Sequence, residues 1–508
     1  VNSYPGCGCD VPSHFYSYSF ELNPNWSRKY ALQPEIHQYF SDLAAKYDIT
    51  KHIRFRQAVE FAEWNTSSGT WVVTTRDLES SRIRQRRCKI LVSAVGALSI
   101  PKKCEITGAS SFSGQMFHTA EWDHSFDWKN KEVVVIGDAT QVIPALSEGN
   151  EAAKKVTQFS RQSHWLAERP NPKYSELFKW TMRWVPFAMR AYRAVLYWEK
   201  EKGFKGFDIV SGKEIRRGWT EEAAAYIRTK SPAKYRDFLV PKTEIGCKRR
   251  VNDTGYLASL HRANVELIHD DPITEIVEDG VYTSSGRYVF ADAIVLAIGF
   301  ETHKVLSPME ILGKDGMSIN KHWERVSDGA PSSYFGTCLS GFPNFFVLMG
   351  PNTLSGHLSV IYTTECQINF VIRVISPILK AMHSCRSLFP VIGRLDDVVE
   401  VKPEAEMRDI NKTQEKARSL IWATGCTSWF IDPETNRNTI MFPDWQYKFW
   451  LRSVFVSWKD LAYSASAVIA KGEQVGGGSG LGILVTVLAV GVAGVGAYLF
   501  NYCLALNK

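Results

Sequence analysis

A glycine and an arginine follow two successive strand-like segments, and both residue types suit the binding of a nucleotide phosphate. Residues 133–137 read Val-Val-Val-Ile-Gly, which is typical of a buried parallel strand that enters a Gly-x-Gly-x-x-Gly turn. Arg161 ends the next strand-like segment, which begins at Val156. A basic residue at that place is the expected partner of a 2′-phosphate and would select NADPH over NADH. The spacing therefore predicts a dinucleotide site that contains Gly137 and Arg161.

The turn after Gly137 departs from this pattern. It reads Gly-Asp-Ala-Thr-Gln-Val-Ile-Pro, with no glycine two or five residues after Gly137. A side chain therefore replaces a hydrogen where the backbone must approach a pyrophosphate. Asp138 also adds a negative charge there. We expect this turn to disfavour the binding of NADPH.

Two further segments contain residues that could take part in binding or in a reaction. Residues 112–123 read Phe-Ser-Gly-Gln-Met-Phe-His-Thr-Ala-Glu-Trp-Asp, and a strand-like segment follows them at once. Lys248, Arg249 and Arg250 are consecutive. Because an arginine cannot lose its charge near neutral pH, it suits the stabilisation of an anionic oxygen.

The first of these segments resembles the fingerprint of the Baeyer–Villiger monooxygenases, F-x-G-x-x-x-H-x-x-x-W followed by Pro or Asp. Its fixed positions are Phe112, Gly114, His118 and Trp122. The resemblance extends from residue 1 to about residue 465. It implies an α/β fold with two Rossmann-like dinucleotide-binding domains, one for FAD and one for NADPH.

The same resemblance implies roles for individual residues. Arg249 is the expected catalytic residue that contacts the oxygenated flavin, and Asp10 is expected to lie beside the flavin and to pair with Arg249. His118 and Trp122 are expected to couple the two domains rather than to touch the substrate. The residues expected to bind the two cofactors are Asp10, Tyr16, Val59, Ala97, Gly137, Gln141, Arg161, Gln162, Lys248, Arg249 and Gly350.

The expected domain organisation follows from these assignments. The parts are a first FAD-binding segment (1–130), an NADPH-binding domain with a helical insert (131–298), a second FAD-binding segment with the substrate region (299–470), a linker (471–480) and a transmembrane helix (481–503). The first segment lacks the strand, Gly-x-Gly-x-x-Gly turn and helix that hold an FAD pyrophosphate. The chain also starts at Val1. We therefore expect an N-terminally truncated sequence.

The C-terminal part suggests a membrane location. Residues 481–500 carry no charge and are enough to span a bilayer as one helix. Lys459 and Lys471 precede them and only Lys508 follows, so the positive-inside rule favours a cytosolic catalytic body. The Trp-rich helical region 174–202 is expected to serve domain packing rather than interaction with a partner.

Composition excludes some classes. The net charge of +7 is mild and spread along the chain, which does not indicate nucleic acid. The ten cysteines include no Cys-x-x-Cys pair, so we expect no metal site.

The resemblance implies an enzyme that uses FAD and NADPH to insert one oxygen atom of O2 into a ketone, which gives an ester or lactone. The wording of several segments is similar to fungal members, which suggests secondary metabolism and a polyketide- or terpenoid-derived ketone. Two alternatives remain open: an N- or S-oxygenating flavin monooxygenase, and a catalytically inactive, membrane-anchored remnant.

Overall fold

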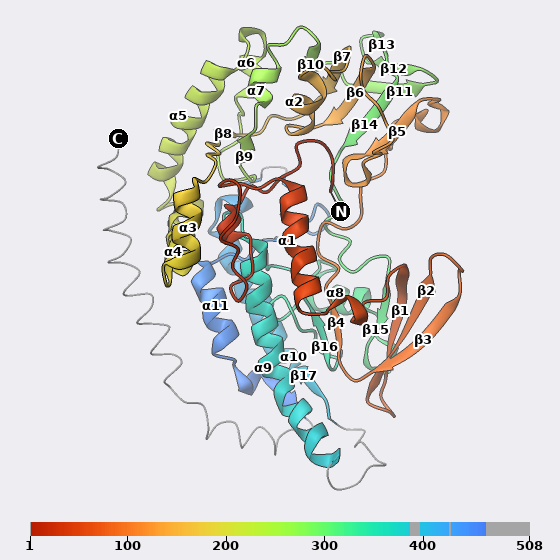
Figure 1. Cartoon of the computed structure of the whole chain (residues 1–508). Coiled ribbons are helices and arrows are strands. Elements are labelled where there is room, and N and C mark those ends of the chain that lie inside the picture. Colours follow the sequence, from red (N-terminus) through yellow and green to blue (C-terminus); the bar gives the residue numbers. More distant parts are fainter. Residues whose placement is uncertain (1, 387–396, 426–427, 464–508) are drawn as a thin grey trace.

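The computed structural model describes residues 2–386, 397–425 and 428–463. Two lobes are visible, one built on a parallel sheet and the other on long helices beside a β-hairpin sheet (Figure 1). The helical insert and the N-terminal segment lie between them along one side (Figure 1).

The first lobe is organised around a five-stranded parallel sheet with the order β10-β7-β6-β14-β5. These strands are β10 (Val265–Ile268), β7 (Lys155–Phe159), β6 (Glu132–Gly137), β14 (Ala293–Ala297) and β5 (Gln115–His118). Val133, Val134 and Val135 are all buried, because helices or strands cover both faces of the sheet. The predicted strand at 133–137 is confirmed by β6.

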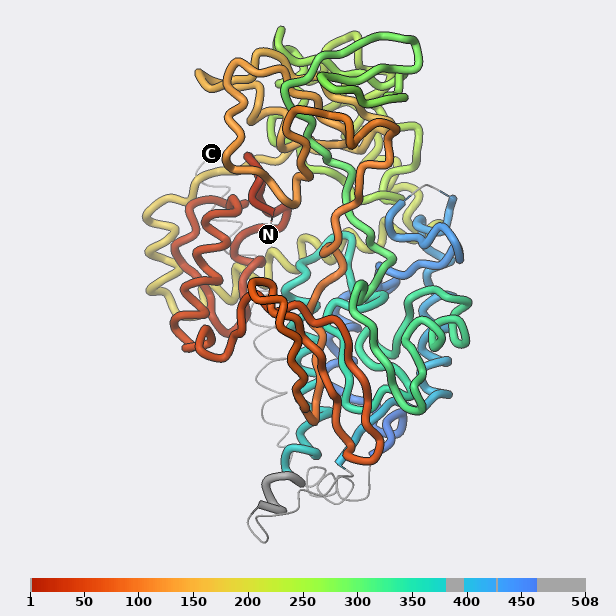
Figure 2. The backbone as a smooth tube through the Cα atoms, turned by 90° about the vertical axis from the view of Figure 1, so that its right-hand side faces the viewer, coloured from red at the N-terminus to blue at the C-terminus, as the bar shows by residue number. Residues whose placement is uncertain are grey.

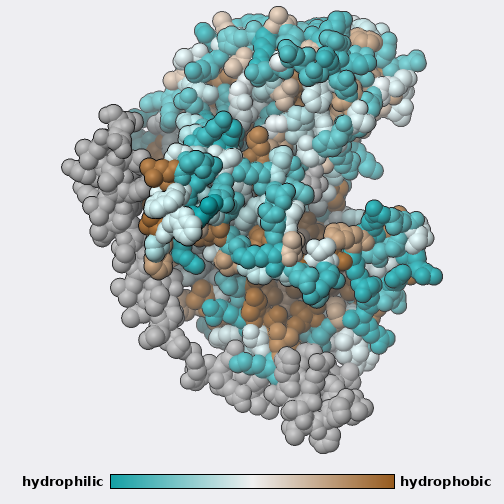
Figure 3. All heavy atoms as spheres, in the orientation of Figure 1, coloured by the Kyte–Doolittle hydropathy of each residue, from teal (hydrophilic) through white to brown (hydrophobic). Residues whose placement is uncertain are grey.

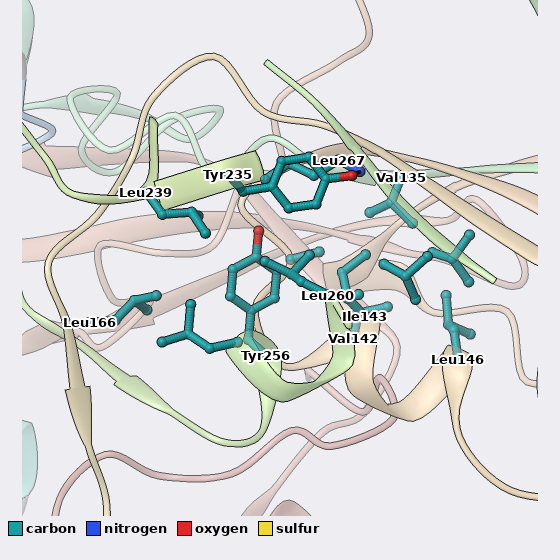
Figure 4. Close-up of a cluster of buried hydrophobic side chains, with 14 of the residues drawn as sticks. Val135, Val142, Ile143, Leu146, Leu166, Tyr235, Leu239, Tyr256, Leu260 and Leu267 are labelled. Carbon is teal, nitrogen blue, oxygen red and sulfur yellow. Dashed lines mark hydrogen bonds between the residues drawn. The ribbon is translucent and has the colours of Figure 1, made fainter. Parts of the chain in front are cut away.

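One face of this sheet packs against short helices. They are α2 (Val142–Ser147), α6 (Arg236–Leu239) and α7 (Tyr256–Ser259). Figure 4 shows the apolar cluster that joins α2 and α7 to the sheet, with the ring of Tyr256 near its centre. The Tyr256 hydroxyl donates to Oε1 of Gln158 at 2.7 Å, which satisfies both polar groups inside the core. The other face carries the meander β11 (Ile273–Val277), β12 (Gly280–Thr283) and β13 (Tyr288–Phe290).

The second lobe combines small sheets with helices. Its strands are the parallel pair β4 (Leu91–Ser93) and β16 (Phe345–Val347), the sheet β15 (Glu310–Leu312), β1 (Gln57–Asn65), β2 (Thr70–Asp77) and β3 (Ile83–Cys88), and the pair β17 (Val399–Val401) and β18 (Leu461–Tyr463). Its helices are α1 (Gln33–Lys46), α8 (Ile319–Ser327), α9 (Val360–Arg386), α10 (Pro403–Arg418) and α11 (Gln446–Val454).

The helical insert consists of α3 (Glu176–Trp184), α4 (Ala188–Glu201) and α5 (Lys213–Lys230). It begins after β8 (Leu166–Glu168) and returns to β9 (Val251–Asp253), and these two strands pair in parallel. This pairing fixes the segment around Lys248 and Arg249, just before β9, against the body of the protein.

Two connections join the lobes and run side by side. Lys102 N–H donates to the Gly299 carbonyl at 3.0 Å, and Glu301 N–H donates to the Ile100 carbonyl at 2.9 Å. Figure 2 shows the two tubes, near residues 100 and 300, passing together between the lobes.

Within the part of the chain that the structure describes, no helix is both long and apolar enough to cross a membrane. The predicted linker at 471–480 and the predicted transmembrane helix at 481–503 lie outside the described residues.

Candidate active site

The centre of the site is an ion pair between Arg249 and Asp10. Nε of Arg249 donates to Oδ2 of Asp10 at 2.8 Å, and Nη2 lies 2.6 Å from the same oxygen. Asn252 of β9 also donates to the Asp10 backbone carbonyl at 3.4 Å, which ties the two segments together. The structure thus joins the two residues predicted to be catalytic.

The environment of Arg249 keeps its charge fixed. Burial alone would lower the pKa of Arg249, but the Asp10 carboxylate outweighs it and the pKa is raised. The Arg249 side chain is still 29% exposed, toward an adjacent cavity. A second cation, Arg169, donates to the Cys9 carbonyl at 3.0 Å and lies over the ring of Tyr30.

A cavity of about 450 Å³ opens beside the ion pair. Arg249, Lys248 and Lys200 supply cations to its lining. Its aromatic walls are Phe207, Trp219, Trp422 and Phe430. A cavity whose lining combines cations with aromatic rings suits a planar cofactor and an apolar substrate with one polar group.

One histidine on the wall of the first cavity contacts a buried carboxylate. Nε2 of His357 lies 3.0 Å from Oε2 of Glu201, whose side chain is fully buried at the end of α4. Oε1 of Glu201 accepts from the Tyr447 N–H at 3.2 Å, which fixes the carboxylate in turn. The His357 ring is therefore oriented before any ligand binds.

The predicted flavin-side residues are placed differently. Tyr16 lies near the ion pair, and burial, followed by the neighbouring Cys9 and Asp10, raises the pKa of Tyr16. Ala97 packs on the apolar cluster that contains Phe207 and Trp422. A Cβ on Gly350 would come within 2.4 Å of the Gly336 carbonyl oxygen, so only glycine fits that turn. Val59 lies in β1 of the hairpin sheet and is not part of the cavity wall.

A second cavity, of about 630 Å³, lies at the carboxyl end of the five-stranded sheet. Gly137, Arg161 and Gln162 line it, as the sequence predicted for the nucleotide site. Gly137 has φ +112°, and a Cβ there would lie 2.2 Å from the Ala297 carbonyl oxygen. Gln141 lies elsewhere, where it accepts a hydrogen bond from the Tyr4 hydroxyl at 2.9 Å.

Asp138, which follows Gly137 in the turn that departs from the Gly-x-Gly-x-x-Gly pattern, also lines this second cavity. Its Oδ1 accepts from the Ser160 hydroxyl at 3.0 Å, and its Oδ2 lies 2.6 Å from Nε2 of His164. Two neighbouring side chains thus contact the carboxylate, which partly offsets its charge at the place where a phosphate would lie.

Lys248 connects the two cavities. It lines the first cavity, and its Nζ donates to Oε1 of Gln162, which lines the second. Burial lowers the pKa of Lys248, and the Asp138 carboxylate opposes that change. Lys248 and Arg249 are adjacent in the chain, and Lys248 contacts a residue of the second cavity while Arg249 lines the first.

The fingerprint residues line neither of these two cavities. His118 ends β5. Its ring packs edge-on against the ring of Phe300 in the second connection between the lobes, with 5.8 Å between the ring centroids. Trp122 packs in the core of the first lobe against Phe117. A Cβ on Gly114 would lie 2.6 Å from the Asp292 carbonyl oxygen.

Several residues of the site were not found from the sequence. The aromatic walls Trp219, Trp422 and Phe430 and the His357–Glu201 pair come from separate elements. No motif in the sequence marks Trp219 or Glu201, whereas His357, Trp422 and Phe430 lie within 299–470, the segment predicted to contain the substrate region. The length of α4 and its alternation of polar and apolar residues give no signal that Glu201 reaches a histidine 156 residues away.

The sequence and the fold agree with those of known proteins. A family described as "Flavin-binding monooxygenase-like" matches residues 13–189. A Baeyer-Villiger monooxygenase of Pseudomonas aeruginosa is 31% identical over 452 residues, which cover 88% of this chain and 81% of that protein. The FAD-binding monooxygenase ktnD of Aspergillus niger is 31% identical over 481 residues, which cover 92% and 76%.

Among solved structures, OTEMO in complex with FAD and NADP has a TM-score of 0.74 at 25% identity. The match covers 91% of this chain and 92% of that one. The 31% identity to the Pseudomonas aeruginosa enzyme over most of both chains, together with the two lobes and the fingerprint, identifies the family. The chain belongs to the Baeyer–Villiger family of flavin-dependent monooxygenases.

Proposed function

We propose that this protein uses FAD, NADPH and O2 to convert a ketone into an ester or lactone. The observation that carries the proposal is the Arg249–Asp10 pair on the wall of the first cavity, connected through Lys248 to the second. A monooxygenase that uses two cofactors needs a flavin site and a nucleotide site that adjoin each other.

The residues that line the two cavities offer partners to both cofactors. On the flavin side, the first cavity is lined by the fixed guanidinium of Arg249 and by aromatic rings, which suit a flat ring with a polar edge. On the nucleotide side, Arg161 and Gln162 offer charge and hydrogen bonds to phosphate and ribose groups. Bound FAD would supply the reaction with oxygen, and bound NADPH would supply the hydride.

The protein's own contribution is position and charge. Asp10 orients Arg249 and limits its mobility, so that a permanent cation faces the position where negative charge develops on oxygen. The aromatic walls exclude water and hold the apolar part of a ketone. Lys248 donates a hydrogen bond to Gln162 and so helps to position that residue on the wall of the second cavity, where the nucleotide would bind.

The test is a purified protein with a measured visible spectrum, followed by turnover with NADPH and ¹⁸O₂. The proposal predicts bound flavin and one ¹⁸O atom in an ester or lactone formed from a ketone. Arg249→Ala should lower product formation by roughly 10²- to 10³-fold while bound flavin is retained. Oxidation of amines or sulfides without ester would support the N- or S-oxygenating alternative, and absence of flavin would support the inactive remnant.

Two finer parts of the function stay predictions. The similarity to fungal enzymes suggests a polyketide- or terpenoid-derived ketone, which a substrate panel in the same assay tests. The single-pass C-terminal membrane helix is tested by carbonate extraction of membranes from expressing cells, because a spanning protein stays in the pellet.

A further inference from the structure

Helix α3 turns its apolar side toward solvent. Leu177, Trp180 and Trp184 are three and four residues apart, so they lie on one side of the helix. Their exposed fractions are 73%, 55% and 64%. Met182, on the other side of the helix, is buried. The expectation that this Trp-rich region serves domain packing therefore holds for the side of α3 that carries Phe178 and Met182, but not for the side that carries these three exposed residues.

The turn after α3 extends the same surface. Val185 is exposed, and Phe187 is 78% exposed with φ +64°, a backbone conformation that a bulky side chain rarely adopts. The aromatic ring thus projects from the tip of the α3–α4 hairpin. We call Leu177, Trp180, Trp184, Val185 and Phe187 together the α3 patch.

Basic residues surround the α3 patch. Residues 173–190 contain the basic residues Lys173, Lys179, Arg183 and Arg190, against a single acidic residue, Glu176. Lys173, Arg183 and Arg190 are exposed. The patch therefore combines protruding aromatic rings with a net positive border.

We propose that the α3 patch binds the surface of an anionic lipid bilayer. Tryptophan is favoured at the boundary between headgroups and acyl chains, where an amphipathic helix lies in the plane of the membrane. Lysine and arginine beside such a helix attract anionic headgroups. Hydrophobic atoms reach the surface over α3 and α4 in the space-filling view (Figure 3).

The shape of the patch favours a bilayer over a protein partner. Its side chains project from the convex outer side of a helix and from a turn, rather than lining a groove. Projecting rings enter a fluid bilayer without a complementary surface, whereas a protein must supply matching pockets. The proposal rests on α3 and its turn alone and does not depend on residues 481–500.

The fold connects the α3 patch to the first cavity. α4 starts at Ala188, next to Phe187, and ends at Glu201. Its last turn supplies Glu199 and Lys200 to the cavity wall, about 20 Å along the helix from the patch. In combination with the proposed function, this places the ketone-binding cavity close to a membrane that dissolves apolar substrates.

Hydrogen exchange of the full chain tests the proposal at the patch itself. We would compare exchange with no vesicles, with phosphatidylcholine vesicles, and with vesicles that contain 30% phosphatidylserine. Amides of residues 176–188 should exchange at least fivefold more slowly with the anionic vesicles than without vesicles. The protection should decrease in 1 M salt, where charges are screened within about 3 Å.

The matched variants are a triple change in the patch, Trp180→Ser, Trp184→Ser and Phe187→Ser, and a control, Leu78→Ser with Ile83→Ser. The control residues are comparably exposed, on the β2–β3 hairpin. All five side chains are exposed, so both variants should keep the wild-type unfolding temperature. The triple change should abolish the protection and the control should keep it.

Three results would overturn the proposal. One is vesicle binding without protection of residues 176–188, which would assign binding to another segment. Another is the same protection without vesicles, rising with protein concentration, which would assign the patch to a second copy of the chain. The last is concentration-independent protection without vesicles that the triple change relieves, which would mean that another segment of the same chain covers the patch.

Discussion

The guanidinium of Arg249 contacts the carboxylate of Asp10 through two nitrogens, Nε at 2.8 Å and Nη2 at 2.6 Å, and both reach the same oxygen, Oδ2. The two residues are 239 positions apart, and one belongs to the N-terminal segment while the other precedes β9. Oδ1 of Asp10 takes no part in this contact. The pair therefore fixes the direction of the guanidinium, which also lines the first cavity.

Replacing Asp10 with Asn should separate the positioning of Arg249 from its charge. The amide keeps the shape of the side chain but gives up the ion pair, so Arg249 becomes more mobile and the pKa of Arg249 falls. We expect ester formation to drop by about 10- to 100-fold, as a misplaced catalytic group does. The ester formed per NADPH consumed should also fall, measured by product chromatography beside oxygen uptake.

Asp10→Glu is the control for that substitution, because it restores the carboxylate at a shifted distance. Partial recovery of the ester-to-NADPH ratio is expected. If Asp10→Asn lowered only the unfolding temperature and left this ratio unchanged, Asp10 would be a structural residue and not a positioning residue for Arg249.

Arg161 should determine the preference for NADPH. It ends the segment after β7 and lines the second cavity, where a 2′-phosphate would meet a fixed positive charge. Arg161→Ala should raise the KM for NADPH by about 10- to 100-fold, the usual cost of a hydrogen bond to a charged group. The KM for NADH should change less than threefold, and equal losses for both nucleotides would contradict the assignment.

Asp138 should weaken nucleotide binding by its charge. Its carboxylate lines the same cavity, and Ser160 and His164 offset the charge only in part. Asp138→Asn should lower the Kd for NADP⁺ by about 3- to 10-fold, the size of a screened charge–charge repulsion. Titration calorimetry measures this without turnover. An unchanged or weaker affinity would mean that Asp138 organises the loop rather than repelling phosphate.

The sequence predicted best those features that depend on local order. The strand that ends at Gly137 follows from its run of apolar residues. The pairing of Asp10 with Arg249 could not follow from such patterns, because contacts between distant segments depend on how the lobes pack. It was expected only from the resemblance to a family.

The α3 region marks the limit of periodicity. The spacing of Leu177, Trp180 and Trp184 shows that they share one side of a helix, but it does not show what covers that side. The cavity walls were missed for a related reason. Trp219 lies on α5 and Trp422 lies in the short 3-10 helix Ile421–Ala423, and only the folded structure brings them to one cavity.

Gly114 of the fingerprint should be essential for packing. A Cβ there would lie 2.6 Å from the Asp292 carbonyl and 2.7 Å from the Phe112 ring, so the backbone of β5 would have to move. Gly114→Ala should lower the free energy of unfolding by about 1–3 kcal/mol. Gly218→Ala is the matched control, since nothing lies within 4 Å of its added Cβ in α5, where alanine should stabilise the helix by up to about 1 kcal/mol. Urea denaturation of both variants measures the contrast, and equal effects would contradict it.

His14 should make the stability of the N-terminal segment depend on pH. Its ring is buried against Tyr174, Phe178 and Tyr192, and burial, aided by the charge of Arg193, lowers the pKa of His14 to about 4. The unfolded chain binds this proton near pH 6.5, so stability is present above that pH and is lost as the pH falls toward 4. The loss attributable to His14 is about 3 kcal/mol. Urea denaturation between pH 7.5 and 4.5 should show a flatter profile for His14→Gln and an unchanged profile for His37→Gln on the exposed side of α1. Parallel profiles for His14→Gln and the wild-type chain would mean that His14 is protonated equally in both states.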